Sequence, residues 1–249
     1  MIYGKIPSPT ISVVIPTRER PHHLVESIKS LQITAEDFSR VEVVVQIDYE
    51  DKLTLARIGE LAAMNVRAVV SPRGGGYADV HRYFAECIQA SFGPHILVWS
   101  DNTRMLTYGW DSRIASIRHE LYHGTFNSEH GWRFPFVPRK LCDIIGGLGP
   151  RPYIDVWVGD ICTNWASGVP FVYFGDVMLE HDGPPPPALW DERDHHRQKV
   201  VDYNVTVDQN TPEIHALKMR DHMKLKEYLA LKETLVAQTG VGSVDPSQG

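Results

Sequence analysis

The chain has 249 residues, of which 43% are hydrophobic and 22% are charged, so it can bury a full hydrophobic core without disulfide or metal cross-links. Its 25 basic and 31 acidic residues give a formal net charge of −6. This acidic balance argues against nonspecific binding to nucleic acid or to an anionic membrane surface, although a local basic groove is compatible with it.

The first hundred residues alternate between predicted strands and predicted helices. The apolar segments predict strands at 11–15, 41–47, 66–70 and 96–99, and the segments between them predict helices at 21–31, 51–64 and 77–92. Because these strands are apolar throughout, helices should cover both of their faces, as in a parallel sheet built from βαβ units. Ligands bind beyond the carboxyl ends of such strands. The expected site therefore lies in the four polar segments that follow the strands, at 17–20, 48–51, 71–76 and 100–102.

The rest of the chain is less regular. The pattern predicts helices at 108–117, 139–145, 154–166 and 212–238, and strands at 121–126, 171–174 and 177–179. The helix at 139–145 should end at Gly146-Gly147, and Thr211-Pro212 should begin the last helix. We expect residues 184–210, with four consecutive prolines, to form a lid or connector, and residues 241–249 to form a disordered tail.

Polar side chains at the predicted strand ends suggest binding chemistry. Asp101 follows a buried strand and could hold a divalent cation through its hard oxygen ligands, or could simply stabilise a turn. Asp48 could accept a hydrogen bond from a nucleobase or a ribose, with a turn again as the alternative. Arg73 and the glycines after it precede a helix, an arrangement that favours phosphate, but the segment matches neither GxGxxG nor the P-loop pattern and could be a flexible connector.

Three further side chains could take part in catalysis. His181 could complete a metal shell that a lone carboxylate leaves open. Asp155 and Asp160 lie near aromatic residues, which could raise the basicity of a carboxylate by desolvation. They are five residues apart and would not share a helix face, so at most one should be a general base.

The order of these segments resembles the GT-A-fold glycosyltransferases of the family 2 type over roughly residues 9–183. Residues 11–20 (ISVVIPTRER) resemble the opening "SVVIPTYNR" of that family, and residues 43–48 (VVVQID) resemble its "IIVVDD" strand. Residues 96–102 (ILVWSDN) stand where the family has its DxD motif. The later segments 109–111 (GWD), 134–140 (FPFVPRK), 157–160 (WVGD) and 177–181 (VMLEH) resemble its acceptor-side and metal-binding segments.

The resemblance implies an α/β fold, a GT-A-like, Rossmann-type and mostly parallel sheet with flanking helices and a smaller mixed acceptor-side region. The glycosyltransferase domain would span 1–183, with the nucleotide-sugar half at 1–103 and the acceptor half at 104–183, before the connector and the helix at 211–240. The implied reaction moves a sugar from a UDP- or GDP-sugar to an acceptor hydroxyl with inversion, assisted by Mn²⁺ or Mg²⁺.

The resemblance also implies roles for particular residues. The donor-binding residues would be Thr17, Arg18, Glu19, Asp48, Arg73, Gly74, Ser100 and Asp101. The metal ligands would be Asp101, Asn102 and His181, the catalytic base Asp160, and the acceptor-binding residues Trp110, Arg139 and Trp157. The strict DxD pattern is not kept, because Ser100 and Asn102 replace its two acids. Metal affinity should therefore be weak, or completed by the diphosphate of the donor.

Two other functions fit the same segments: a nucleotidyltransferase, and a GT-A-like module that binds a nucleotide sugar without transferring it. The acceptor could be a glycan, a small molecule or a hydroxymethylated DNA base, as in some phage enzymes. Aromatic and basic residues that could contact such an acceptor are Trp132, Arg133, Phe134, Phe136, Lys140, Arg151 and Tyr153.

The sequence predicts a cytoplasmic location. No apolar segment approaches the roughly 20 residues of a membrane helix, and no basic region followed by an apolar segment opens the chain. The three cysteines, Cys87, Cys142 and Cys162, form no CxxC pair, which predicts buried thiols in a reducing compartment. The last helix should pack on the sheet domain or on another subunit.

Overall fold

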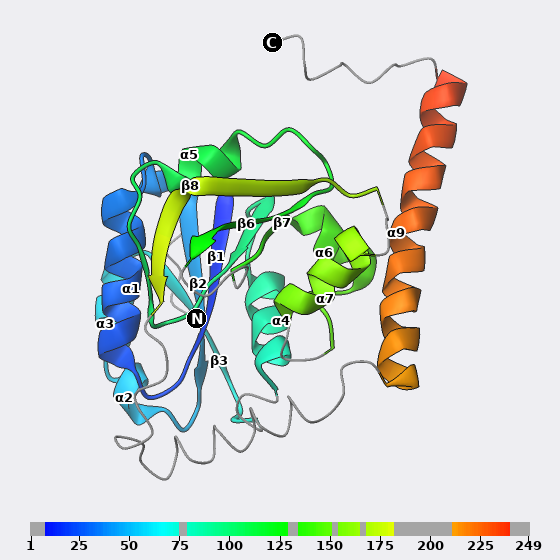
Figure 1. Cartoon of the computed structure of the whole chain (residues 1–249). Coiled ribbons are helices and arrows are strands. Elements are labelled where there is room, and N and C mark those ends of the chain that lie inside the picture. The colour runs from blue at the N-terminus through cyan, green and yellow to red at the C-terminus, as the bar shows by residue number, and fades with distance from the viewer. Residues whose placement is uncertain are drawn as a thin grey trace.

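The structure, a computed structural model, describes residues 8–74, 79–128, 134–150, 154–164, 168–181 and 211–239. Within these residues, eight strands form one sheet in the order β3-β2-β1-β4-β7-β6-β8-β5. Helices lie on both faces of this sheet, as Figure 1 shows. The predicted α/β architecture is thereby confirmed.

The first half of the chain builds the parallel part of the sheet. Its strands are β1 (Ile11–Thr17), β2 (Val41–Asp48), β3 (Val66–Ser71) and β4 (His95–Val98). Its helices are α1 (Pro21–Thr34), a 3₁₀ turn η1 (Phe38–Arg40), α2 (Lys52–Leu55), α3 (Ile58–Ala63) and α4 (Val80–Ala90). The pairs β1–β2, β1–β4 and β2–β3 are all parallel, as the apolar strands predicted.

Several predicted boundaries in this half were wrong, among them the ends of the helices predicted at 21–31 and 77–92, which are at Thr34 and Ala90. The strand predicted at 11–15 does not end before Pro16, because β1 continues through this proline to Thr17. Val14 accepts a hydrogen bond from Trp99 and so faces β4, and Pro16, two residues later, faces the same side beyond the end of β4. The missing proline N–H therefore breaks no ladder bond. The single helix predicted at 51–64 is divided into α2 and α3.

The second half adds mixed pairing. Its strands are β5 (Thr103–Met105), β6 (His123–Ser128), β7 (Phe136–Pro138) and β8 (Phe171–His181). Its helices are α5 (Trp110–Ala115), α6 (Arg139–Ile145), α7 (Ile154–Gly159), the π-helix η3 (Asp160–Asn164) and α9 (Pro212–Thr239). Strand β7 pairs antiparallel with β4 and β6, and β5 pairs antiparallel with β8.

The sequence pattern missed or divided some of these elements. Strands β5 and β7 have three residues each, too few for a period to show. The strands predicted at 171–174 and 177–179 form the single strand β8, whose pairing with β6 is irregular between Phe126 and Asn127. Helix α6 has the predicted bounds and ends where expected, since Gly146 takes the left-handed φ of +85° and donates its N–H to Cys142.

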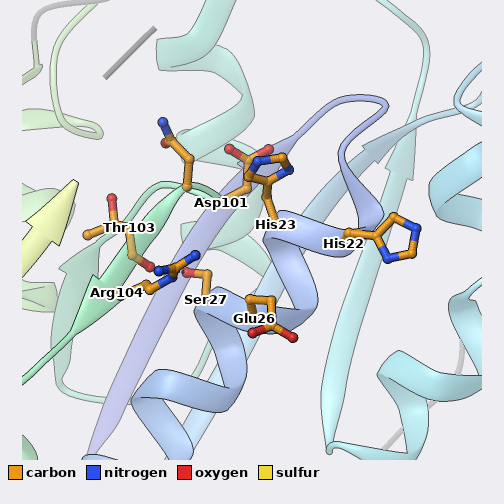
Figure 2. A pocket seen from close by; sticks show the side chains of 8 residues that line it. His22, His23, Glu26, Ser27, Asp101, Thr103 and Arg104 are labelled. Atoms are coloured by element: carbon orange, nitrogen blue, oxygen red, sulfur yellow. Dashed lines mark hydrogen bonds between the residues drawn. The ribbon is translucent and has the colours of Figure 1, made fainter. Parts of the chain in front are cut away.

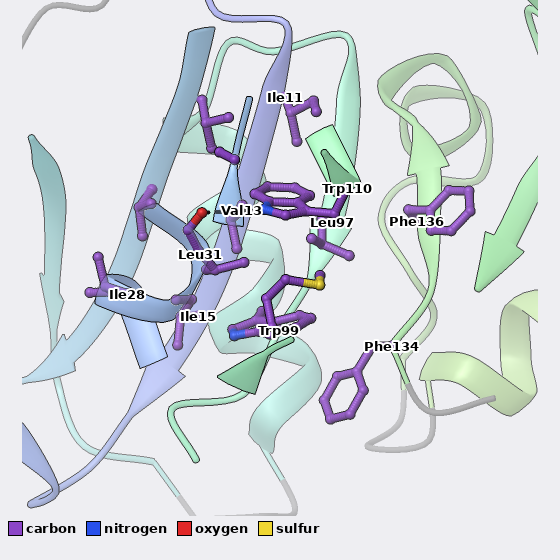
Figure 3. Close-up of a cluster of buried hydrophobic side chains, with 14 of the residues drawn as sticks. Ile11, Val13, Ile15, Ile28, Leu31, Leu97, Trp99, Trp110, Phe134 and Phe136 are labelled. Atoms are coloured by element: carbon purple, nitrogen blue, oxygen red, sulfur yellow. Dashed lines mark hydrogen bonds between the residues drawn. The ribbon is translucent and has the colours of Figure 1, made fainter. Parts of the chain in front are cut away.

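The sheet separates two hydrophobic clusters because successive strand residues point to opposite faces. Ile11, Val13 and Ile15 pack with α1, α3 and α5 on one face, and Figure 3 shows this cluster around the rings of Trp99 and Trp110. The other cluster holds Val14 and Val44 with side chains from α4, α6, α7 and α9. Because β1, β2, β3 and β4 are parallel, their carboxyl ends lie at the same edge of the sheet.

Helix α9 lies against α6 and extends beyond the rest of the described structure, as Figure 1 shows. Leu231 and Leu235 near its end are exposed. Contact of this helix with another subunit stays a prediction. Among the helices of the described residues, none combines the length and the apolar character needed to cross a membrane.

His123 of β6 makes the stability of the fold dependent on pH. It is 5% exposed, its Nε2 lies 2.7 Å from Thr163 Oγ1, and burial lowers its pKa to about 4. The unfolded chain, with an ordinary histidine pKa of about 6.5, binds more protons between these two values, so the free energy of unfolding should fall as the pH falls through this window. We expect wild type to lose about 2 kcal/mol more than His123→Gln between about pH 7 and pH 5, measured by urea unfolding. Equal losses in the two proteins would contradict this assignment.

Candidate functional site

The ends of β1 and β4 are joined by buried polar side chains. Thr17, the last residue of β1, donates its hydroxyl to Asp101 Oδ2 at 2.8 Å. Arg20 Nη1 lies 4.0 Å from the other carboxylate oxygen, Oδ1. Asp101 is 7% exposed, so this carboxylate is held in place with one edge near the surface.

The ends of β1 and β2 are joined by an ion pair. Arg18 Nε donates to Asp48 Oδ2 at 2.6 Å, and Gln46 Nε2 donates to Asp48 Oδ1 at 3.1 Å. Asp48 is 1% exposed, whereas the Arg18 side chain is 27% exposed. Burial lowers the pKa of Arg18, but the hydrogen bond and the charge of Asp48 raise it by more, so this guanidinium stays charged. The residue that faces solvent is therefore the arginine, with the carboxylate beneath it.

Glu19 connects this group to the loops after β2 and β3. Its φ of +54° is unusual for a residue other than glycine, and its N–H donates to Asp51 Oδ2 at 2.7 Å. Its Oε1 lies 3.7 Å from Arg73 Nη1. The N–H of Arg73 in turn donates to Glu50 at 3.2 Å. The polar segments that the sequence placed after β1, β2 and β3 thus meet.

Tyr83 of α4 joins the same group, although no sequence pattern indicated a role for it. Its hydroxyl accepts hydrogen bonds from Arg18 Nη2 and from the N–H of Gly74, each at 2.9 Å. A Cβ at Gly74 would lie 2.3 Å from Asp79 Oδ2 and 2.8 Å from the Tyr83 hydroxyl, so a larger residue there would have to displace the ends of these side chains. The Gly74 N–H, which the sequence suggested for phosphate, is occupied by Tyr83.

A pocket of about 140 Å³ lies next to Asp101, as Figure 2 shows. It is lined by residues of α1 and of the segment from Asp101 to Arg104: His22, His23, Glu26, Ser27, Asp101, Asn102, Thr103 and Arg104. Carboxylate, imidazole and guanidinium groups in so small a space suit a polar ligand group. Because Asp101 belongs both to the pocket and to the network at the strand ends, the two form one continuous polar region.

Two of the predicted metal ligands, Asp101 and Asn102, lie in the turn before β5, and the third, His181, ends the neighbouring strand β8. His181 is paired with Thr103 across β5 and β8, and its Nδ1 lies 2.9 Å from Thr103 Oγ1. Asn102 Oδ1 accepts a hydrogen bond from Ser100 at 2.5 Å. The described part of the chain contains no group of three or more His, Cys, Asp or Glu side chains arranged to hold a metal. One carboxylate with an imidazole and an amide nearby fits a cation that receives its remaining ligands from a diphosphate, as Mg²⁺ and Mn²⁺ often do.

Asp160 makes its described contact with helix α9 and not with the loops at the strand ends. It opens the π-helix after α7, and its Oδ2 forms an ion pair with Lys218 of α9, which is only 4% exposed. The neighbouring turn of α9 carries Asp221, which accepts a hydrogen bond from Trp157 at 3.3 Å. No pattern in the sequence indicated that α9 would supply the partner of the predicted base.

The predicted acceptor-binding residues are engaged inside the fold. Trp110 is 0% exposed and donates to the Leu31 carbonyl, and Trp157 is 2% exposed. Arg139 donates to the carbonyls of Gly93 and Ile88 and to the Ser91 hydroxyl, and so ties α6 to the end of α4. Neither tryptophan has a ring face open to an acceptor in this structure. Outside the described residues lie Gly75, Gly76, Trp132, Arg133, Arg151, Tyr153, the connector at 184–210 and the tail at 241–249.

No protein-family model matches the sequence, and no curated protein is significantly similar to it. The fold, however, is similar to several solved structures. The mannosyltransferase PcManGT from Pyrobaculum calidifontis, in complex with GDP-Man and Mn²⁺, aligns with a TM-score of 0.57 and 11% identity over 95% of this chain and 77% of that one. TarS 1-349 of S. aureus aligns with a TM-score of 0.56 and 13% identity over 87% of this chain and 70% of that one.

A third similar structure is the glucosyl-3-phosphoglycerate synthase of Mycobacterium tuberculosis, in complex with Mn²⁺, UDP and glucosyl-3-phosphoglycerate. It aligns with a TM-score of 0.51 and 13% identity over 78% of this chain and 77% of that one. The chain therefore has the fold of the GT-A glycosyltransferases, as its resemblance to the family implied. At these identities the similarity shows the fold alone.

Proposed function

We propose that the chain binds a nucleotide-diphosphate sugar at the carboxyl ends of β1, β2, β3 and β4 and transfers the sugar to an acceptor hydroxyl with inversion. The observation that carries the proposal is the connected polar group around Thr17, Arg18 and Glu19. These three consecutive residues contact Asp101, Asp48 and Arg73, which lie at or just after the carboxyl ends of β4, β2 and β3. In an α/β sheet this edge is where ligands bind.

The proposed roles follow from exposure and charge. Arg18 and Arg73 would donate hydrogen bonds to the nucleotide, since its base carbonyls and phosphates offer acceptor oxygens. The hydroxyls of Thr17 and Ser100 donate to Asp101 and Asn102, so they would accept hydrogen bonds from the nucleotide. Asp101, Asn102 and His181 would hold Mn²⁺ or Mg²⁺ together with the diphosphate. When bound, this cation would supply charge neutralisation for the departing diphosphate. Structures with similar folds contain GDP-Man with Mn²⁺ and UDP with Mn²⁺, which supports both donor and cation as candidates.

Asp160 is the proposed general base. It would take the proton of the acceptor hydroxyl as that oxygen forms its bond to the anomeric carbon and the bond to the diphosphate breaks. Attack opposite the departing diphosphate inverts the anomeric configuration. Lys218 would keep the carboxylate of Asp160 in place from α9.

Thermal denaturation with a panel of UDP- and GDP-sugars tests the proposal directly. A ligand that binds the folded state raises its stability by RT ln(1 + [L]/Kd), so a donor at about a hundred times its Kd should add about 2.7 kcal/mol. We expect one nucleotide series to raise the melting temperature in the presence of Mn²⁺, and EDTA to remove most of that rise. If neither series shifts the transition with or without metal, the donor site is wrongly assigned.

A second candidate is a module that binds a nucleotide sugar without transferring it. It is favoured by the single acid in Ser100-Asp101-Asn102 and by the lack of a three-residue metal cluster in the described residues. Product analysis with glycan, small-molecule and hydroxymethylated-DNA acceptors separates the possibilities. Transfer releases a nucleoside diphosphate, a nucleotidyltransferase would release pyrophosphate, and the binding module would release neither.

A further inference from the structure

Tyr83 occupies a central position beneath the proposed donor site. It is 5% exposed and comes from α4, which is separate in sequence from the loops it contacts. Its one hydroxyl accepts hydrogen bonds from Arg18 and from the Gly74 backbone. The end of β1 and the segment after β3 are thus held by the same oxygen atom.

The ring of Tyr83 also supports two guanidinium groups. Arg18 Cζ lies 5.8 Å and Arg82 Cζ 4.8 Å from the ring centroid, both within the range of a cation–π contact. Arg82 is anchored further by Glu86 at 3.1 Å and by the Pro72 carbonyl at 3.1 Å. The aromatic ring is therefore fixed by its surroundings, and the direction of its hydroxyl with it.

Arg18 is held from two sides by groups that a ligand cannot easily reach. Asp48 engages its Nε and Tyr83 its Nη2, and both partners are at least 95% buried. Because the Arg18 side chain keeps 27% exposure, it is the part of this trio that can touch a nucleotide. Its guanidinium offers only hydrogen-bond donors, so it would meet an acceptor oxygen of a base or of a phosphate.

We propose that Tyr83 is a positioning residue of the donor site, which orients Arg18 toward an acceptor oxygen of the nucleotide and fixes the segment at Gly74 beside it. This inference rests on the proposed function and deepens it. It assigns Asp48, which the sequence suggested as a direct ligand of the nucleoside, to the same indirect role. The tyrosine hydroxyl is the group to remove, since phenylalanine keeps the ring and its packing.

Tyr83→Phe should weaken binding of UDP or GDP, whichever the wild type prefers, about tenfold, as expected for loss of a hydrogen bond to a charged group. The matched control is Tyr122→Phe. Tyr122 is 0% exposed, and its hydroxyl lies 2.5 Å from His95 at the opposite end of β4, away from the proposed site. Isothermal titration well below the melting temperature of each protein measures the Kd, and thermal denaturation measures the stability. Titration with pyrophosphate tells whether Arg18 contacts an oxygen of the base or of the phosphates. If Tyr83→Phe also weakens the binding of pyrophosphate, Arg18 contacts the phosphates.

The expected result is a weaker Kd in Tyr83→Phe and an unchanged Kd in Tyr122→Phe, even if the control loses more thermal stability. For turnover, Tyr83→Phe should raise the KM for the donor more than it lowers kcat. If wild type binds the nucleotide and Tyr83→Phe binds it with the same Kd, the inference about Tyr83 is wrong and the proposed function stands. The same holds if Tyr83→Phe and Tyr122→Phe lose equal affinity for the nucleotide. Absence of nucleotide binding by wild type would instead overturn the proposed function, and this inference with it.

Discussion

Asp101→Asn is expected to reduce sugar transfer by about two orders of magnitude or more while leaving the chain folded. Asp101 is the one acid of the Ser100-Asp101-Asn102 segment, and Thr17 and Arg20 hold it at the end of β4. Asparagine can still accept the Thr17 hydrogen bond, but it carries no charge to attract a divalent cation. The measurement is the initial rate of nucleoside diphosphate release as Mn²⁺ is titrated, with the variant requiring far more metal or failing to respond.

Asp111→Asn is the matched control for that substitution. Asp111 is also buried, at 5% exposure, and its two carboxylate oxygens accept the backbone N–H groups of Glu36 and Asp37 at 2.8 and 2.9 Å. It should lose stability but keep its metal response and its turnover at temperatures where it is folded. If Asp101→Asn keeps the wild-type rate and metal dependence, Asp101 is a structural residue that holds Thr17, and the proposed metal site is wrong.

Asp160→Asn is expected to lower transfer about a thousandfold while the Kd of the donor stays the same, because the group that takes the acceptor proton is lost after the donor has bound. The substitution should also lower the stability of the fold, because Asp160 forms an ion pair with the buried Lys218. Loss of the negative charge leaves Lys218 unbalanced, and breaking a buried pair typically costs about 3–5 kcal/mol of stability, less here because asparagine still accepts a hydrogen bond. Single-turnover rates and donor titration, both below the melting temperature, separate the two effects.

Asp221→Asn provides the comparison for Asp160→Asn. Asp221 is 1% exposed and accepts hydrogen bonds from Trp157 and from Lys224 at 3.3 Å each, in the same packed region of α7 and α9. Both substitutions should destabilise the chain, and only Asp160→Asn should stop transfer. Equal turnover in the two variants would assign Asp160 to the packing of α9 and leave the base to be sought elsewhere, with Asp155 as the first alternative.

The sheet and the edge that carries the polar loops were predictable from the sequence. Val43, Val44 and Val45 cannot all be buried unless both faces of β2 are covered, which demands helices on each side and parallel neighbours. The polar residues after each strand then had to meet at one edge. These features can be predicted from local sequence, because the spacing of apolar residues within a segment shows whether it forms a buried strand or a helix.

The partners within the site were decided by tertiary structure. Nothing near Arg18 in the sequence indicates that Asp48 and Tyr83 contact it, since those residues are 30 and 65 positions away. Asp160 likewise meets Lys218 across 58 positions, through the packing of α9 on η3. Tertiary packing also buried Trp157 beside α9 and Trp110 on the opposite face of the sheet, beside α1. The chemistry of both side chains suits ligand contact and core packing equally well. Residue type and spacing define what a side chain can bind, whereas long-range packing decides which side chains face the ligand and which hold the others in place.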